Sequence, residues 1–310
     1  MARARSRLAQ DLAWRAESAG FDALSLVLRL LPVEAVSGLG AWLLRRLGPL
    51  TRAHSTARLN LRIAFPELDD AARARLLAEQ WDNLGRTLFE FPLTHRLTPR
   101  SGRIEVVGRE RLEAVAAGGG PAVLVAGHFA NWEVMAAVIV DAGVRCRVTY
   151  RAANNPYIDR RIIETRARYG VELFGAKGQE GGREVLRTLE SGGSVALMND
   201  QKFNGGVLAP LFGAPAHTAV GPTRLGLRFG GRLLPLSVQR LPGVRFRVTV
   251  HPPILLTRTG SREADLRAGV EQVNGFVESV VRAHPGQWFW THRRWPAEAY
   301  AAAARAEAGG

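Results

Sequence analysis

One apolar stretch, residues 122–138 (AVLVAGHFANWEVMAAV), constrains the fold of this chain more than any other. Its first five residues are small or branched and apolar, and they end at Gly127. A second apolar run starts at Val134. The first run has the length of a buried strand, and the second reads as the start of a buried helix, with a tight turn between them. A strand that passes into a helix in this way is typical of an α/β fold.

His128 and Glu133 lie at the junction of this unit, where an α/β fold places its ligand crevice. Two positions five apart on one helix point about 140° away from each other, so the side chains meet only if His128 is still in the turn. A His held by a carboxylate is a general base with a fixed tautomer. The helix N-terminus offers backbone N–H groups that suit a developing oxyanion. The alternatives are a structural His and a Glu that only favours the helix start.

The chain after residue 100 repeats the alternation of strands and helices, and this alternation predicts an α/β fold. We expect the mostly parallel central sheet to be covered by helices on both faces. Residues 202–220 are rich in Gly and Pro and are predicted to form a long loop. The predicted strands are 102–107, 122–126, 144–150, 171–174, 194–198, 233–239 and 245–251, and the predicted helices are 110–117, 156–169, 180–189, 221–229 and 262–283.

The N-terminal 48 residues differ in character from the rest. Residues 1–19 are basic and polar, whereas residues 21–44 are apolar but interrupted by Arg29, Pro32 and Glu34. No run of 18 uncharged apolar residues is present there, so a conventional transmembrane helix is not expected. Two helices broken at Pro32 and lying in a membrane interface fit better. A helical hairpin packed on the core is the alternative.

The remaining organisation follows from the same patterns. Two further helices are predicted within residues 52–95, separated by Pro66. We therefore divide the chain into membrane-associating helices (1–48), one α/β domain (49–300) and a frayed helix or tail (301–310).

The net charge of +14 narrows the choice of partners. Only Lys177 and Lys202 are lysines, so nearly all of the positive charge comes from arginine, spread along the whole chain. Such a surface attracts phosphates, acidic proteins and anionic lipid headgroups. Nucleic acid is not an expected partner, because the sequence has no zinc-finger spacing, no basic zipper and no aromatic RNA-binding motif.

The sequence provides a candidate base but no obvious protein nucleophile. It has no GxSxG elbow, no Walker A motif and no GxGxxG, and Cys146 sits in an apolar run that favours the core. The seven histidines show no metal-ligand spacing, so we expect neither a metal nor a cofactor. A base without a protein nucleophile suggests that the substrate supplies the hydroxyl and that the transfer is direct.

Two polar residues follow predicted strands and should share the sheet edge with His128. Arg151 comes after residues 144–150 and suits bidentate contact with phosphate. Asp200 comes after residues 194–198, with a cap for the following loop as its alternative role. Residues 287–295 (QWFWTHRRW) combine three tryptophans with two arginines, which is typical of a membrane-interface patch or of a packed C-terminal segment.

Five regions in a fixed order resemble the bacterial lipid A biosynthesis acyltransferases, which are related to the glycerolipid acyltransferases. Residues 127–133 (GHFANWE) are similar to the His-x4-acid motif of these enzymes. The resemblance extends over nearly all of the chain beyond residue 20. The other segments are NLRIAFPEL (60–68) with NLGRTLFE (83–90), YRAANNPYID (150–159), NDQKFNGGVLAPLFG (199–213) and FWTHRRW (289–295).

The resemblance implies that residues 49–300 are an acyltransferase domain at the cytoplasmic face of the inner membrane, held there as a peripheral or monotopic protein. It implies transfer of a fatty acyl chain from an acyl carrier protein, or from coenzyme A, to a hydroxyl of a lipid A precursor, without a covalent enzyme intermediate. His128 would be the base and Glu133 its orienting partner. The resemblance also implies substrate-binding roles for Arg151, Asp200, Asn131 and Arg293.

Two other functions stay open at this point. A phosphatidylinositol mannoside acyltransferase, or another glycolipid or lysophospholipid acyltransferase, would share the His-x4-acid motif. A non-catalytic cationic membrane-binding protein belongs to another class. Asp200-Gln201 and the HRRW ending favour lipid A, and the intact pair of His128 and Glu133 argues for an enzyme.

Overall fold

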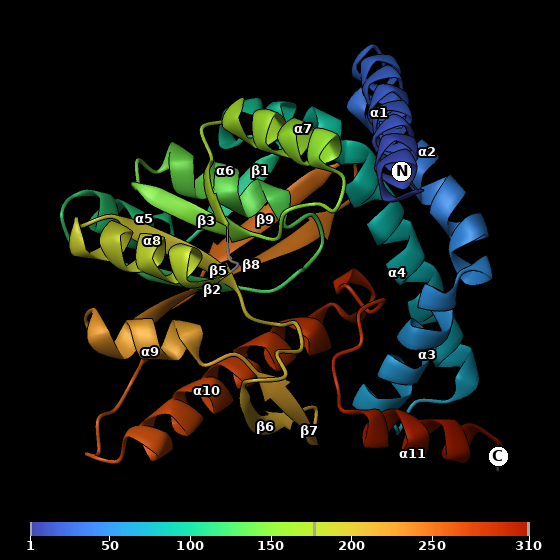
Figure 1. The fold of residues 1–310 in the computed structure, drawn as a ribbon. Coiled ribbons are helices and arrows are strands. Elements are labelled where there is room, and N and C mark those ends of the chain that lie inside the picture. Colours follow the sequence, from blue (N-terminus) through green and yellow to red (C-terminus); the bar gives the residue numbers. More distant parts are fainter. Residues whose placement is uncertain (1, 176–177, 309–310) are drawn as a thin grey trace.

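The central sheet has the strand order β1-β9-β8-β2-β5-β3-β4 in the computed structural model, which describes residues 2–175 and 178–308 (Figure 1). Pairing is parallel throughout, except that β8 pairs antiparallel with β9 and with the short β10. The predicted mostly parallel sheet is therefore confirmed. Its strands are β1 (Ile104–Val107), β2 (Val123–Ala126), β3 (Cys146–Tyr150), β4 (Glu172–Gly175), β5 (Ser194–Met198), β8 (Arg232–Leu241), β9 (Arg245–Val250) and β10 (Ile254–Leu255).

Helices cover both faces of this sheet, as the buried strand β2 illustrates. Leu124 packs in one apolar cluster with Val138 of α6, whereas Val123 and Val125 pack in a second cluster with Val185 of α8. Successive side chains of a strand point to opposite faces, so a strand buried on both sides is apolar at every position. The helices around the sheet are α5 (Arg109–Ala116), α6 (Glu133–Asp141), α7 (Pro156–Ala167), α8 (Gly178–Glu190), α9 (Gly221–Arg228) and α10 (Arg262–Ala283).

The predicted loop at 202–220 is wrong, because it contains a β-hairpin. Strands β6 (Val207–Leu211) and β7 (Ala214–Thr218) pair antiparallel and are joined by Phe212 and Gly213, both with positive φ. Pro210 lies opposite Pro215 in this ribbon. A proline is tolerated where its missing N–H faces away from a ladder, and a two-stranded ribbon has two such free edges. The same prolines made the segment read as a loop.

Four helices at the N-terminus precede the sheet, and the break predicted at Pro32 is confirmed. They are α1 (Ala2–Arg29), α2 (Val33–Leu47), α3 (Arg52–Ala64) and α4 (Asp70–Glu90). Residues 2–19, predicted as the basic part of the N-terminal helical region, belong to α1. Helix α2 packs closely on α4, since a Cβ atom added to Gly40 would lie 2.3 Å from the Gly85 carbonyl oxygen.

Helices α1 and α2 keep large apolar side chains exposed among their charged residues. Helix α2 has one face packed on α4 and another face exposed, and a place in a membrane interface stays a prediction. Among the described helices, none is both long and apolar enough to cross a bilayer. The large apolar side chains exposed within residues 8–50 are Leu8, Leu12, Leu24, Leu26, Val27, Leu30, Leu31, Leu39, Trp42, Leu47 and Leu50.

The C-terminal residues are more ordered than a tail. Helix α11 (Ala297–Ala308) follows the last apolar segment and lies against α3, with an ion pair between Arg58 and Glu307. The predicted tail at 301–310 thus continues a helix that starts earlier. Its last two residues lie outside the described part of the chain.

Candidate active site

His128 lies two residues beyond β2, in the turn that leads to α6, as predicted. Helix α6 begins at Glu133. Ala130 in this turn has a φ of 41° and is fully buried. A non-glycine residue holds this left-handed conformation only where its surroundings fix it. The turn that carries His128 is therefore a constrained feature of the fold.

Asp200 holds the His128 ring. Its Oδ1 atom lies 2.8 Å from His128 Nδ1, and its Oδ2 atom accepts hydrogen bonds from the backbone N–H of His128 (2.7 Å) and from Trp288 Nε1 (2.7 Å). Strand register explains this meeting, because Ala126 of β2 pairs with Met198 of β5. Each functional residue follows its strand by two positions. Asp200 was expected on the same edge as His128, and the structure places it in direct contact.

Within the described residues, His128 and Glu133 form no hydrogen bond with each other, although this contact was predicted. The Glu133 carboxylate instead accepts from Arg166 Nε (2.9 Å) and Nη2 (2.6 Å) of α7, and from Tyr169 Oη (3.1 Å). Asp200 occupies the position next to the ring that was predicted for Glu133. Sequence spacing could not reveal this exchange, because Asp200 and Arg166 are brought to the site by other elements. What Glu133 does in a reaction stays a prediction.

Burial and the contact between the two side chains have opposite effects on the pKa values of His128 and Asp200. Burial lowers the pKa of His128, but the charge and hydrogen bond of Asp200 more than offset it, so the pKa stands above its usual value. Burial raises the pKa of Asp200, yet the contacts with His128 and Trp288 outweigh it and lower this pKa to about 2. The carboxylate is therefore ionised, and the neutral ring carries its proton on Nδ1. Nε2 is then left free to accept a proton.

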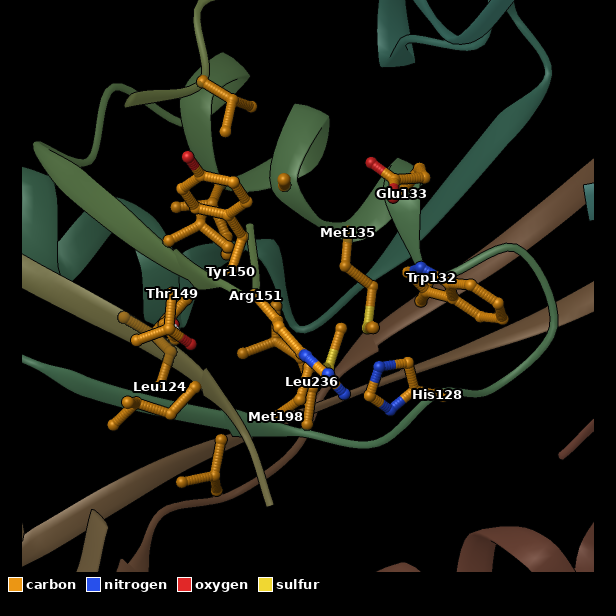
Figure 2. A pocket seen from close by; sticks show the side chains of 18 of the residues that line it. Leu124, His128, Trp132, Glu133, Met135, Thr149, Tyr150, Arg151, Met198 and Leu236 are labelled. Carbon is orange, nitrogen blue, oxygen red and sulfur yellow. Dashed lines mark hydrogen bonds between the residues drawn. The ribbon is translucent and has the colours of Figure 1, made fainter. Parts of the chain in front are cut away.

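A cavity of about 590 Å³ opens beside the His128 ring (Figure 2). Figure 2 shows the ring at one end with Met135 and Met198 next to it, and the Arg151 side chain reaching toward it, as predicted from its strand end. Most of the other lining residues are apolar: Leu124, Val125, Ala126, Ala136, Ile139, Val148, Ile162, Val171, Ala196, Leu197 and Leu236. A pocket with one polar end and long apolar walls suits a ligand with a reactive head and a hydrocarbon chain.

Aromatic residues close the site around the ring. The Trp132 and Phe289 ring centroids lie 5.2 Å and 6.0 Å from that of His128. His292 also lines the cavity, and its Nε2 accepts from the backbone N–H of Lys202 at 3.0 Å. Residues 287–295 are thus packed against the site, which matches the second of the two predicted roles for this segment.

Two predicted substrate-binding residues are not at the cavity. Asn131 is fully buried, and its Nδ2 donates to Glu90 at 2.7 Å. Arg293 is exposed and lies over the Tyr300 ring, with its guanidinium carbon 4.9 Å from the ring centroid. The neighbouring Arg294 is the buried one, donating to the His217 carbonyl and to Thr218 Oγ1. The residue type in a motif does not tell which way its side chain points. A substrate-binding role for Asn131 and Arg293 stays a prediction, and neither residue lines this cavity.

The start of α6 differs from the predicted oxyanion site as well. The N–H groups of Glu133, Val134 and Met135 already donate to oxygens of Asn131 and Trp132. Arg151 is exposed, lines the cavity, and has no ion-pair partner in the part of the chain that is described. It is therefore the better candidate to meet developing negative charge.

Arg166, Tyr169 and Trp288 were not predicted as site residues. Trp288 was noted only within residues 287–295, which were interpreted as a membrane-interface patch or a packed C-terminal segment. Cys146 is buried as predicted, and burial raises its thiol pKa to about 12, which is unsuited to a nucleophile. The described residues contain no group of three or more His, Cys, Asp or Glu side chains placed to hold a metal ion.

Comparison with known proteins gives a family for this chain. The sequence model of the family "Bacterial lipid A biosynthesis acyltransferase" matches residues 15–297. The lipid A biosynthesis lauroyltransferase of Escherichia coli is 26% identical over 284 residues, covering 89% of this chain and 89% of that protein. The palmitoleoyltransferase of the same organism is 24% identical, over 79% of each chain. A phosphatidylinositol mannoside acyltransferase of Mycobacterium tuberculosis is 26% identical, over 71% of this chain and 69% of that protein.

Proposed function

This chain belongs to the bacterial lipid A biosynthesis acyltransferase family, and we propose that it moves a fatty acyl chain from a thioester donor to a hydroxyl of a lipid A precursor. One observation supports this most directly. The His128 ring, held at Nδ1 by a buried carboxylate, faces one end of a largely apolar cavity of about 590 Å³. A base and a hydrocarbon pocket in one place are what direct acyl transfer requires.

In the proposed reaction, His128 Nε2 takes the proton of the acceptor hydroxyl as its oxygen attacks the thioester carbonyl. A carbon–oxygen bond forms, and the carbonyl oxygen of the resulting tetrahedral intermediate carries a negative charge. Collapse of the intermediate breaks the carbon–sulfur bond, and the imidazolium returns its proton to the leaving thiolate. Asp200 stabilises the imidazolium through the 2.8 Å contact at Nδ1. A positioned general base typically contributes about 10²–10⁴-fold in rate.

Arg151 is the proposed electrophilic group. Its side chain reaches toward His128 in Figure 2 from the end of β3. A guanidinium there could donate to the oxyanion of the intermediate or to a phosphate of the acceptor, which are both anionic oxygens. Glu133 has a different proposed role. By binding Arg166 and Tyr169 it joins α6 to α7, the two helices that border the cavity.

The donor is proposed to be an acyl carrier protein. Carrier proteins of this kind are acidic, and the net charge of this chain is +14. Attraction between opposite charges speeds the association of two proteins, and added salt weakens this attraction by screening it. Carrier binding that is unchanged between low and high salt would contradict this role for the arginines.

The exposed apolar residues of α1 and α2 support a place on the membrane. Trp42 is 52% exposed, and the Arg46 guanidinium carbon lies 4.5 Å from the centroid of its ring. An apolar surface edged by arginine suits the headgroup boundary of an anionic bilayer. We propose that the protein binds the cytoplasmic face of the inner membrane, where a lipid acceptor and a soluble donor would meet.

A phosphatidylinositol mannoside acyltransferase is the second candidate. The Mycobacterium tuberculosis enzyme of that name is as identical to this chain as the Escherichia coli lauroyltransferase, at 26%. The match to the lauroyltransferase covers more of this chain, 89% against 71%, which favours the lipid A acceptor.

A transfer assay tests the proposal. Purified protein would be incubated with acyl carrier protein loaded with a fatty acid and with either a lipid A precursor or a phosphatidylinositol mannoside, and the products analysed by mass spectrometry. We expect one added acyl chain on the lipid A precursor and none with His128→Gln. A folded His128→Gln protein with near-normal transfer would overturn the mechanism. Acylation of the mannoside alone would favour the second candidate, and binding to vesicles without any transfer would favour a non-catalytic protein.

A further inference from the structure

Residues outside the motif form hydrogen bonds with the backbone of the turn that carries His128. The backbone N–H of Ala130 donates to the Gln287 carbonyl at 2.6 Å. The Ala130 carbonyl accepts from Thr87 Oγ1 at 3.0 Å and from Asn83 Nδ2 at 3.4 Å, both on α4. Since Ala130 has a φ of 41°, these bonds stabilise a backbone conformation that an alanine does not favour by itself.

A buried ion pair orders the two α4 side chains that hold Ala130. Arg240, near the end of β8, contacts Glu90 through Nη1 (2.6 Å) and Nη2 (3.0 Å). The same guanidinium donates to Asn83 Oδ1 (2.9 Å) and to Thr87 Oγ1 (3.1 Å). Glu90 is fully buried, and the Arg240 side chain is 10% exposed. One cation therefore fixes both groups that bind the Ala130 carbonyl.

The other side of the Glu90 carboxylate reaches the motif directly. Its Oε2 atom accepts from Asn131 Nδ2 at 2.7 Å, and Asn131 Oδ1 in turn accepts from the backbone N–H of Glu133 at 3.2 Å. Its Oε1 atom accepts from Ser37 Oγ of α2 at 2.6 Å. Glu90 thus contacts the residue after Ala130, which also supports the first turn of α6.

We infer that Glu90 and Arg240 are positioning residues, whose ion pair fixes the turn at residues 127–131 and so sets where the His128 imidazole stands relative to its substrate. The inference rests on the proposed function in that His128 is taken as the base. It gives a role to the segment at 83–90, which was singled out in the sequence by resemblance alone. A misplacement of about 1 Å in a catalytic group can cost on the order of 10²-fold in rate.

A purely structural role is the competing explanation, in which the pair only joins α4 to β8. A buried ion pair generally adds little net stability compared with well-packed apolar residues, whereas breaking it by removing one partner is strongly destabilising. Activity by itself cannot separate the two roles, because a poorly folded variant also loses activity. The test therefore needs a measurement made on the folded protein at His128.

The experiment uses the full chain with Glu90→Gln, which keeps the length of the side chain, and Arg240→Lys, which keeps the charge but loses the planar fork. Asp265→Asn is the matched control. Asp265 is also a buried carboxylate, 8% exposed. It accepts hydrogen bonds from the N–H and Oγ1 of Thr259, and neither residue lines the cavity. For each protein, kcat and KM for the acyl donor are measured beside thermal unfolding. The imidazole ¹⁵N signals of His128, assigned with His128→Gln, are recorded on folded protein.

We expect kcat to fall about 10–100-fold in Glu90→Gln and Arg240→Lys, with KM for the donor within about twofold, because the cavity walls are untouched. The His128 signals should shift or broaden in both variants and stay unchanged in Asp265→Asn. Folded Glu90→Gln with wild-type kcat and unshifted His128 signals would overturn the inference, as would signals that shift equally in Asp265→Asn. If the wild type shows no transfer at all, the proposed function fails, while the imidazole signals still decide whether Glu90 positions His128.

Discussion

His128 Nδ1 lies 2.8 Å from Asp200 Oδ1, so the candidate base is oriented by a carboxylate 72 residues away in the sequence. Glu133, the acid of the sequence motif, is bound by Arg166 instead. The two carboxylates therefore have different partners, since Asp200 contacts the ring and Glu133 binds Arg166 of α7. Changes to the two residues should give different phenotypes.

The pH dependence of the rate should follow the His128–Asp200 pair. The neutral ring is the base, and the pKa of His128 is raised above 6.5, so kcat/KM should fall as the pH drops, with a midpoint above 6.5. Asp200→Asn removes the negative charge that raises the pKa of His128, whereas the burial that lowers this pKa remains. The midpoint should therefore move to lower pH. The plateau should also fall, on the order of 10²–10⁴-fold, because the tautomer is no longer fixed. An unmoved midpoint in Asp200→Asn would contradict the pairing.

Glu133→Gln should affect stability more strongly than the pH profile. It leaves the Arg166 guanidinium, whose side chain is 18% exposed, without its counterion. Breaking a buried pair in this way costs about 3–5 kcal/mol in the free energy of unfolding. Glu190→Gln breaks the exposed pair with Arg228 and should cost about 0–1 kcal/mol. Urea unfolding of both variants is the measurement, and equal losses would argue against the assigned role of Glu133.

Filling the cavity should shorten the acyl chains that the enzyme accepts. Ala136 of α6 lines the cavity, and Ala136→Phe places a ring inside it. We expect KM to rise for long-chain donors while short-chain donors are used nearly as before, since the polar end of the site is unchanged. Ala301→Phe, at an exposed position of α11, is the control. A uniform loss across all chain lengths would mean that the cavity does not hold the acyl chain.

Removing apolar surface from α2 should weaken membrane binding. Trp42 and Leu47 are 52% and 50% exposed, and Trp42→Ser with Leu47→Ser removes both side chains from the proposed contact. Burial of such side chains is worth on the order of 1.5–3 kcal/mol each when complete, so the loss should be measurable by vesicle flotation. Leu255→Ser, at a 70% exposed residue of β10, should bind vesicles like the wild type. Equal binding by all three proteins would exclude α2 as the contact.

Much of the fold could be predicted from local patterns, because they report burial directly. The apolar run before Gly127 predicted β2, and the strand ends correctly placed His128, Arg151 and Asp200 on one edge. Contacts between elements could not be predicted in the same way. Whether Asp200 or Glu133 reaches the ring depends on strand register and on how α7 packs, and neither is encoded in the spacing within a motif.

The hairpin and the direction of the Asn131 side chain escaped prediction for similar reasons. Pro210 and Pro215 look like loop residues until their free edges in a two-stranded ribbon are known. Asn131 carries a polar side chain in a functional motif, yet that side chain faces the interior and Glu90. Sequence patterns identify which residues are unusual, whereas the direction of each side chain comes from the packing of the whole chain.

The pairing of Ala126 with Met198 has a consequence for how this protein can vary over evolution. His128 and Asp200 each lie two residues beyond a paired strand position. Their contact therefore requires the same number of residues after Ala126 as after Met198. A one-residue insertion or deletion between the paired positions and either functional residue would displace one side chain from this contact. Length changes should therefore be excluded from residues 126–128 and 198–200, even where substitutions are tolerated, and should accumulate instead in the exposed connections at the far ends of the strands.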